Sequence, residues 1–188
     1  NTTGARNIAI GYSAYDASNT ENDNIAIGYE AMTTDTAGGT RNVAVGNYAL
    51  DALTSGDNNT AVGHQALSAN NTGSGNVAIG KDVLDANTTG SDNTGLGHNS
   101  LGANTTASNN TGVGHASLES NTTGTGLTAV GQGSLAANTT GDYNVAYGYQ
   151  SLDANTTGSN NTAIGTTSLS ANTTGANNVA VGKQALKV

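Results

Sequence analysis

The sequence predicts an all-β fold: a parallel β-solenoid (β-roll) of about eleven 17-residue coils, each with two short strands. Three observations carry this prediction: a glycine at nearly constant spacing, a β-branched residue three positions before it, and an apolar residue four positions after it. Nine of the ten intervals between these glycines are 17 residues, and the interval from Gly28 to Gly46 is 18. A short fixed period is typical of solenoids, in which each repeat packs on the next. We therefore expect residues 1–188 to form a single repeat array.

The residues just before each glycine predict the first strand. A β-branched residue such as Val77 and a large aliphatic residue such as Ile79 alternate around a small residue, here Ala78. Residues two apart share a face of a strand, so Val77 and Ile79 are expected on one face and Ala78 on the other. We expect the larger pair to point into the coil.

The residues after the glycine predict a second strand and a turn. Most coils carry leucine four positions after the glycine and alanine two positions later, as at Leu84 and Ala86. Asn-Thr-Thr-Gly follows, as at residues 87–90, and both asparagine and glycine tolerate the left-handed backbone of turns. The extra residue of the long interval falls near residues 37–41, in this turn, where insertions are tolerated.

An asparagine opens the first strand of every coil except one, where Leu127 stands. Because stacked coils lie about 4.8 Å apart, identical asparagines should bond to one another along the axis. The predicted structural ladder includes Asn59, Asn76, Asn93 and Asn110.

The middle position of the first strand holds only alanine or glycine in all eleven coils. A solvated strand face normally admits polar residues, so this column is expected to be covered by another copy of the chain. The alternative is that it faces a tight turn within its own coil. The predicted oligomer interface includes Ala61, Ala78, Gly95, Gly112 and Ala129.

Composition excludes several classes of protein. The net charge is −8, only 10% of residues are charged, and no basic stripe exists, so nucleic acid is not an expected partner. No segment is apolar for long enough to span a bilayer, so membrane insertion is not expected, and the absence of cysteine excludes disulfides. An acidic residue five positions after the glycine recurs on every second coil, which predicts a solvent-facing column spaced to limit the repulsion between carboxylates. Arg6, Asp23 and Arg41 form a candidate charge ladder. The chain begins inside one turn and stops inside a second predicted strand, which is typical of a window from a longer fibre.

No pattern predicts an enzyme, a cofactor or a metal site. The three histidines share the column that follows the glycine, but no carboxylate or cysteine joins them in that column. The calcium-binding nonapeptide and the phosphate-binding loop are both absent. The repeated Asn-X-Thr triplets are interpreted as turn chemistry rather than glycosylation sites. The column after the glycine varies while the frame does not, so it and a neighbouring tyrosine are the candidate recognition edge: Tyr12, Tyr29, Tyr48, His64, His98, His115 and Tyr149.

The frame Asn76-Val77-Ala78-Ile79-Gly80, repeated as Asn161-Thr162-Ala163-Ile164-Gly165, resembles the head repeats of trimeric autotransporter adhesins (YadA-like heads). Similar repeats occur in bacteriophage tail fibres. The resemblance covers essentially the whole chain, and it implies a left-handed parallel β-roll assembled as a trimer, with no catalytic residues. The 17-residue unit is longer than the typical head repeat of that family.

We therefore expect an extracellular structural and adhesive fibre segment on a cell surface or a virion. It would offer a rigid multivalent surface to an unknown carbohydrate or protein receptor. Two alternatives remain at this point: a subunit of a self-assembling extracellular filament, and an ice-binding solenoid.

Overall fold

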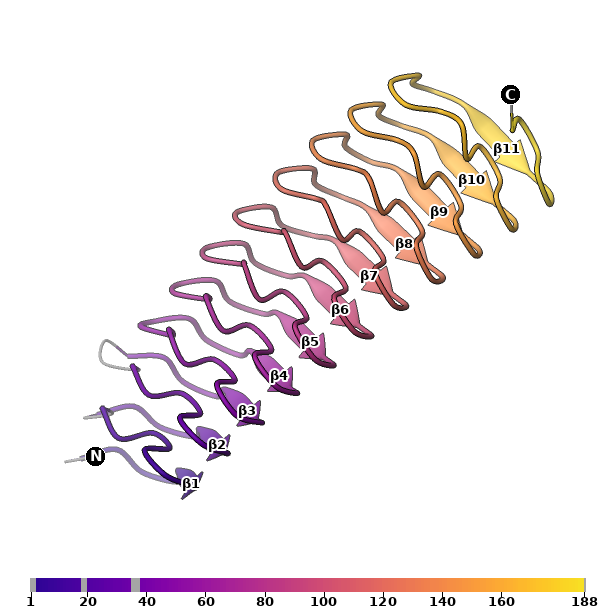
Figure 1. The fold of residues 1–188 in the computed structure, drawn as a ribbon. Helices are drawn as coiled ribbons and strands as arrows, with labels where there is room; N and C mark the ends of the chain where they lie inside the picture. The colour runs from indigo at the N-terminus through magenta and orange to yellow at the C-terminus, as the bar shows by residue number, and fades with distance from the viewer. Residues whose placement is uncertain (1–2, 18–19, 35–37, 188) are drawn as a thin grey trace.

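The computed structural model describes residues 3–17, 20–34 and 38–187, and these residues form a parallel β-solenoid (Figure 1). Eleven three-residue strands form one sheet in chain order, and no helix is present among the described residues. The strands are β1 Ile8–Ile10, β2 Ile25–Ile27, β3 Val43–Val45, β4 Thr60–Val62, β5 Val77–Ile79, β6 Thr94–Leu96, β7 Thr111–Val113, β8 Thr128–Val130, β9 Val145–Tyr147, β10 Thr162–Ile164 and β11 Val179–Val181. The predicted all-β parallel solenoid of 17-residue coils is confirmed.

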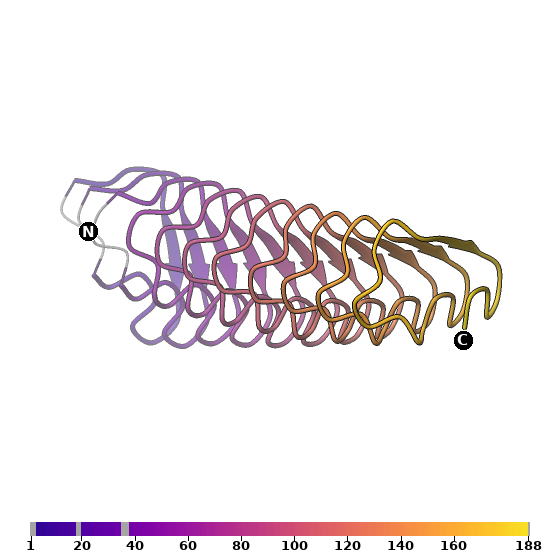
Figure 2. The ribbon, with the colours of Figure 1, turned by 90° about the horizontal axis from the view of Figure 1, so that it is seen from above.

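Every strand pairs in parallel with the strand of the next coil, and equivalent positions always meet (Figure 2). Val77 lies beside Thr94, and Ala78 beside Gly95. The register also holds across the long interval, where Ile25 pairs with Val43. The additional residue is therefore absorbed outside the strands, as the sequence predicts, although residue 37 itself lies outside the described residues.

The predicted second strand is wrong, because the segment after the glycine is a series of turns. In the fifth coil Asp82 and Leu84 both have left-handed backbone, with φ of 55° and 53°. The N–H groups of these two residues point toward opposite neighbouring coils. Asp82 N–H donates to the His64 carbonyl of the preceding coil, and Leu84 N–H donates to the Ser100 carbonyl of the next coil. Each coil is thus bonded to the coils on both sides without a second strand.

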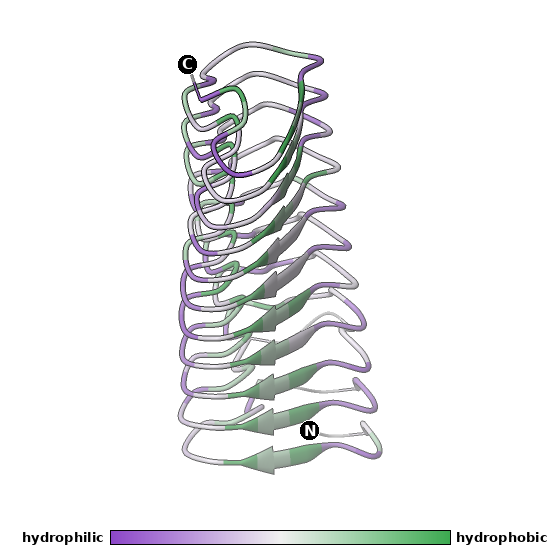
Figure 3. Cartoon of the chain, turned by 90° about the vertical axis from the view of Figure 1, so that its right-hand side faces the viewer, coloured by the Kyte–Doolittle hydropathy of each residue, from purple (hydrophilic) through white to green (hydrophobic). Residues whose placement is uncertain are grey.

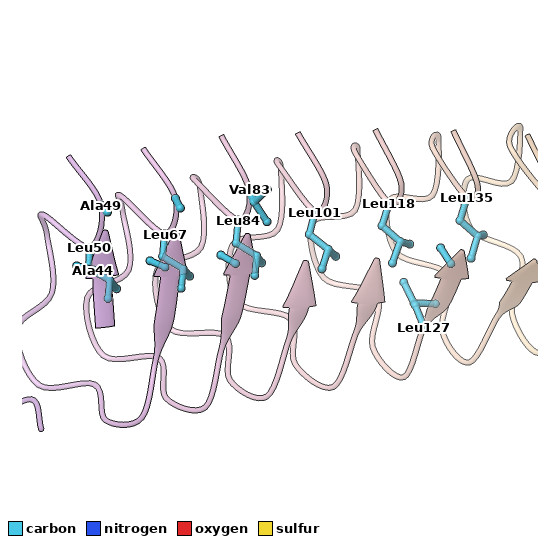
Figure 4. Packing of buried hydrophobic residues seen from close by; sticks show 14 of the residues in the cluster. Ala44, Ala49, Leu50, Leu67, Val83, Leu84, Leu101, Leu118, Leu127 and Leu135 are labelled. Carbon is cyan, nitrogen blue, oxygen red and sulfur yellow. The ribbon is translucent and has the colours of Figure 1, made fainter. Parts of the chain in front are cut away.

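The leucine column fills the interior of the solenoid (Figure 4). Leu84, Leu101 and Leu118 are completely buried. The alanine column, defined as the middle residues of the strands, faces the same interior: Ala61, Ala78 and Ala129 are also 0% exposed. A Cβ added to Gly95 would lie 2.4 Å from Val83 Cγ1, and one added to Gly112 would lie 2.6 Å from Ser100 Oγ.

The prediction that Ala61, Ala78, Gly95, Gly112 and Ala129 form an oligomer interface is therefore wrong. The column holds small residues because the turns of the preceding coil and of the same coil pack directly against the sheet, leaving no room for more than a methyl group. This is the alternative that the sequence left open.

The larger strand residues point outward instead. We call the first and third residues of β1–β11 the outer face; none of these 22 residues is buried, and Leu96 is 41% exposed. Hydrophobic colouring follows the sheet along the length of the solenoid in Figure 3. The expectation that these β-branched and aliphatic side chains fill the coil is therefore also wrong.

The invariant glycine makes the corner after each strand. At Gly46 φ is 140°, and an added Cβ would lie 2.3 Å from the carbonyl oxygen of Gly63 in the next coil. A side chain is excluded both by the backbone conformation and by the close approach of the neighbouring coil. This double constraint explains why the glycine defines the repeat.

Candidate recognition edge

The corner glycine delivers the next residue to an exposed edge beside the outer face. Four rings along this edge form a continuous run over the first four coils. Tyr12 and Tyr29 stack with ring centroids 5.3 Å apart and an interplanar angle of 11°. Tyr29 then meets Tyr48 edge to face at 5.5 Å, and Tyr48 meets His64 at 6.0 Å. Tyr12 is 70% exposed, so the run offers aromatic surface and polar tips to solvent.

A second group lies in the fifth to seventh coils. His98 and His115 stack at 5.3 Å with an interplanar angle of 12°. Asp82 forms an ion pair with Lys81, and its carboxylate lies 3.8 Å from both His64 Nδ1 and His98 Nε2. Asp82 Oδ1 is buried and accepts no hydrogen bond. Sequence reasoning missed Asp82, because it stands one position outside the histidine column.

Tyr149 is placed apart from the other predicted edge residues. It is exposed, and no ring contact joins it to another aromatic residue within the described ranges. The exposed Tyr147 precedes it by two positions, at the end of β9. The predicted edge is therefore one run of four rings, one histidine pair and one separate tyrosine.

The charged side chains of the first coils each contact one nearby partner. The Glu30 carboxylate accepts a hydrogen bond from the Tyr29 phenol and lies close to it, which raises the pKa of Tyr29. On the opposite side of the strands Arg6 Nη2 donates to Asp23 Oδ2 over 2.9 Å, and this contact lowers the pKa of Asp23. Arg41 bonds to the side chain of Asn58 at 2.8 Å. The predicted charge ladder is thus one ion pair, between Arg6 and Asp23, and the Arg41 side chain bonds to an uncharged partner in the next coil.

The predicted asparagine ladder is confirmed. The backbone N–H of Asn93 donates to Asn76 Oδ1 over 3.0 Å, and that of Asn110 to Asn93 Oδ1 over 3.1 Å. Each side-chain amide also donates to a turn carbonyl, as Asn76 does to Gly90 at 2.8 Å. Asn59, Asn76, Asn93 and Asn110 are all fully buried, so the ladder holds the frame and presents nothing to a ligand.

A second buried ladder was missed. Asn87 Nδ2 donates to Asn70 Oδ1 at 2.9 Å and to the Gly90 carbonyl at 3.0 Å, and the pattern repeats through later coils. Asn104 continues it by donating to Asn87 at 2.9 Å. These residues begin the Asn-Thr-Thr-Gly turns, and their spacing of 17 was the signal that could have revealed the ladder. Asn70, Asn87 and Asn104 are completely buried, so the folded chain leaves no room for a glycan on them.

The acidic column on alternate coils is not freely solvated. Burial raises the pKa values of Asp51, Asp85 and Asp153 above that of an ordinary aspartate. Asp51 Oδ1 and Asp153 Oδ1 are buried and accept no hydrogen bond. The prediction that this column faces water is therefore only half right.

The described ranges contain no group of three His, Cys, Asp or Glu residues arranged to hold a metal ion. They also contain no pocket, so a ligand of these residues would meet an open surface. No helix in the described part of the chain is long and apolar enough to cross a membrane. No family model, curated protein or solved structure matches the chain.

Proposed function

We propose that this chain is a rigid segment of a structural, adhesive fibre that displays a repeated surface for attachment. The observation that carries the proposal is a solenoid with unbroken register over eleven strands, bearing exposed rings along one edge. At about 4.8 Å per coil the array is about 50 Å long. Its side-chain ladders bond each coil to the next, which favours a stiff rod over a flexible tether.

The exposed edge supplies separate, modest contact points rather than one deep site. Tyrosine and histidine combine an apolar ring with a polar tip, which suits carbohydrate or protein surfaces. Single contacts of this kind are weak, but a rigid array that engages several together gains from their high effective concentration. We propose an extracellular setting on a cell surface or virion, no enzymatic activity, and a trimer as the assembly implied by the adhesin resemblance.

The test uses the whole chain immobilised on beads and probed against a glycan array and a panel of extracellular-matrix proteins. Binding should fall at least about tenfold when Tyr29→Ser and His64→Ser are combined, because the run of rings is then broken at two of its four members. Thr89→Ser is the matched control, since Thr89 is exposed away from the edge. Binding that is unchanged in the double variant would remove the edge from the proposal. End-to-end polymers of the soluble chain would instead favour the filament alternative.

A further inference from the structure

The outer face is an exposed, uncharged surface that follows the sheet from β1 to β11. Its 22 residues are isoleucine, valine, leucine, threonine and one tyrosine, and none carries a charge. Val113 and Val130 in the middle of the array are half-buried, whereas Ile79, Leu96 and Ile164 are exposed. Contiguous apolar surface of this extent on a soluble protein marks an interaction site.

The dimensions of the face are those of a protein interface. Eleven strands at about 4.8 Å give a length near 50 Å, and three extended residues give a width near 10 Å. The projected area is therefore about 500 Å², and the protruding side chains increase the accessible area further. A specific complex of standard size buries about 800 Å² on each partner. The outer face alone supplies most of that area.

The borders of the face have the anatomy of an interface rim. Lys81 and Asp82 lie beyond the carboxyl ends of the strands, and Arg6, Asp23 and Arg41 lie beyond their amino ends. The centre is uncharged, and both borders are largely polar and carry these few charges, which is the usual arrangement at protein–protein contacts.

We infer that the outer face is where two copies of this chain meet. A partner that covers the whole face must itself be flat, uncharged and about 50 Å long, and its side chains must repeat with the spacing between coils. A second copy has all of these properties because it has the same sequence and fold. Two such faces can interdigitate along their full length as packed sheets do. The inference concerns assembly rather than attachment: two fully overlapping faces give a dimer, in place of the trimer that the adhesin resemblance implies, and the test does not depend on what the recognition edge beside this face binds.

The inference relocates self-association from the alanine column to the opposite side of the sheet. Lysine at position 96 should therefore separate the copies, since Leu96 is on the central strand β6 and its side chain already reaches solvent in the single chain. The control is Thr106→Lys, which adds the same charge at an exposed position in a turn.

The experiment measures the mass of the full chain by sedimentation and light scattering at micromolar concentration. We expect a dimer for the wild type and for Thr106→Lys, and a dissociation constant raised about a hundredfold or more by Leu96→Lys, because like charges then face each other. Circular dichroism and the melting temperature of the dissociated variant show whether each chain remains folded. A monomeric wild type, or a Leu96→Lys variant that remains as associated as the control, overturns the inference.

A second measurement places the contact. The chain has no cysteine, so Leu96→Cys and Thr106→Cys each introduce one thiol. When two faces overlap completely, β6 lies opposite β6 whether the axes run parallel or antiparallel, because it is the sixth of eleven strands. A short bis-maleimide should join copies of Leu96→Cys and leave Thr106→Cys uncoupled. The reverse pattern would place the contact elsewhere and refute the outer face, whether or not the recognition edge binds a receptor.

Discussion

Asn93→Asp changes one atom in the centre of the first asparagine ladder and should be among the most damaging isosteric substitutions in this chain. Asn93 Nδ2 donates to Asn76 Oδ1 at 3.1 Å and to the Ala107 carbonyl at 2.9 Å, and Asn93 Oδ1 accepts from Asn110 N–H at 3.1 Å. The variant replaces the double donor by an oxygen that faces two acceptors in a buried environment.

The cost follows from the lost bonds and the buried charge. Each lost hydrogen bond contributes about 1 kcal/mol, and an unpaired buried carboxylate adds several more, so we expect a loss of about 3–5 kcal/mol at pH 7. Asn93→Leu should cost less, because a leucine already occupies this ladder: Leu127 is buried there, and its N–H still donates to Asn110 Oδ1 at 3.0 Å. The comparison separates the loss of bonds from the burial of a charge.

The assay is thermal and urea unfolding followed by far-ultraviolet circular dichroism. A loss of 3–5 kcal/mol corresponds to a fall in melting temperature of about 10 °C for a chain of this size. Burial raises the pKa of the new carboxyl in the folded chain, so the penalty grows as pH rises from about 4 and is smallest below that value. An Asn93→Asp variant that melts with the wild type at pH 7, or an Asn93→Leu variant that is less stable, would refute this account of the ladder.

Three further substitutions address the corner, the acidic column and the core. Gly97→Ala should lower the free energy of unfolding by about 3 kcal/mol, because φ is 114° and the new Cβ would lie 2.8 Å from the next coil's backbone. Its control is Gly102→Ala, whose new Cβ meets only a movable side chain, so this variant should melt within a few degrees of the wild type. Asp51→Asn and Asp153→Asn should each raise the melting temperature by about 2 °C at pH 7 and leave it unchanged at pH 3.5. Folding favours the neutral form of both carboxyl groups, so their ionisation destabilises the fold only above the pKa of the unfolded chain. An equal gain at both pH values would contradict this. Leu101→Asp should abolish cooperative melting near physiological temperature, and a melting temperature equal to that of the wild type would remove Leu101 from the core.

The period alone was enough to predict the parallel register and the first ladder. Stacking equivalent positions follows from a repeat of constant length, and an asparagine that recurs once per coil can satisfy itself only along the stack. The insertion could be placed in a turn for the same reason, because a residue added within a strand would have moved Ile25 out of register with Val43.

Which face of the strand points into the coil could not be predicted from the repeat pattern. Large residues that alternate with alanine are compatible with a wide coil, in which the large residues point inward and the alanines outward. They are equally compatible with a thin coil, in which the large residues point outward because the interior admits only methyl groups. The position three after the glycine gave the missing information: it holds Ala66, Val83 and Ser100 in successive coils, so a second column of small residues had to face something. In the structure it faces the alanine column.

The side-chain contacts of the turns could not be predicted from the sequence either. Asn99 lies in the turns that follow the corner glycine, and its Nδ2 donates to Glu119 Oε1 at 2.6 Å. The two residues are 20 apart and belong to neighbouring coils, so their contact depends on how tightly the turns curl. Asn99→Asp therefore places two carboxylates together, and it is not the neutral comparison for Leu101→Asp that an exposed position would provide.

The pairing of the two small columns gives a quantitative test of the thin core. Val83 is the only residue larger than alanine or serine in its column, and the strand residue that it meets twelve positions later is Gly95, where most coils have alanine. Gly95→Ala should cost about 1–3 kcal/mol, because its Cβ would overlap Val83 Cγ1 at 2.4 Å. Val83→Ala alone should cost about 2–3 kcal/mol through the space that it leaves. The double variant recreates the alanine pair of Ala66 and Ala78, so its loss should be smaller than the sum of the two single losses by at least about 1 kcal/mol. Additive losses would mean that the columns do not share one space, and the explanation for the alanine column given by the structure would fail with them.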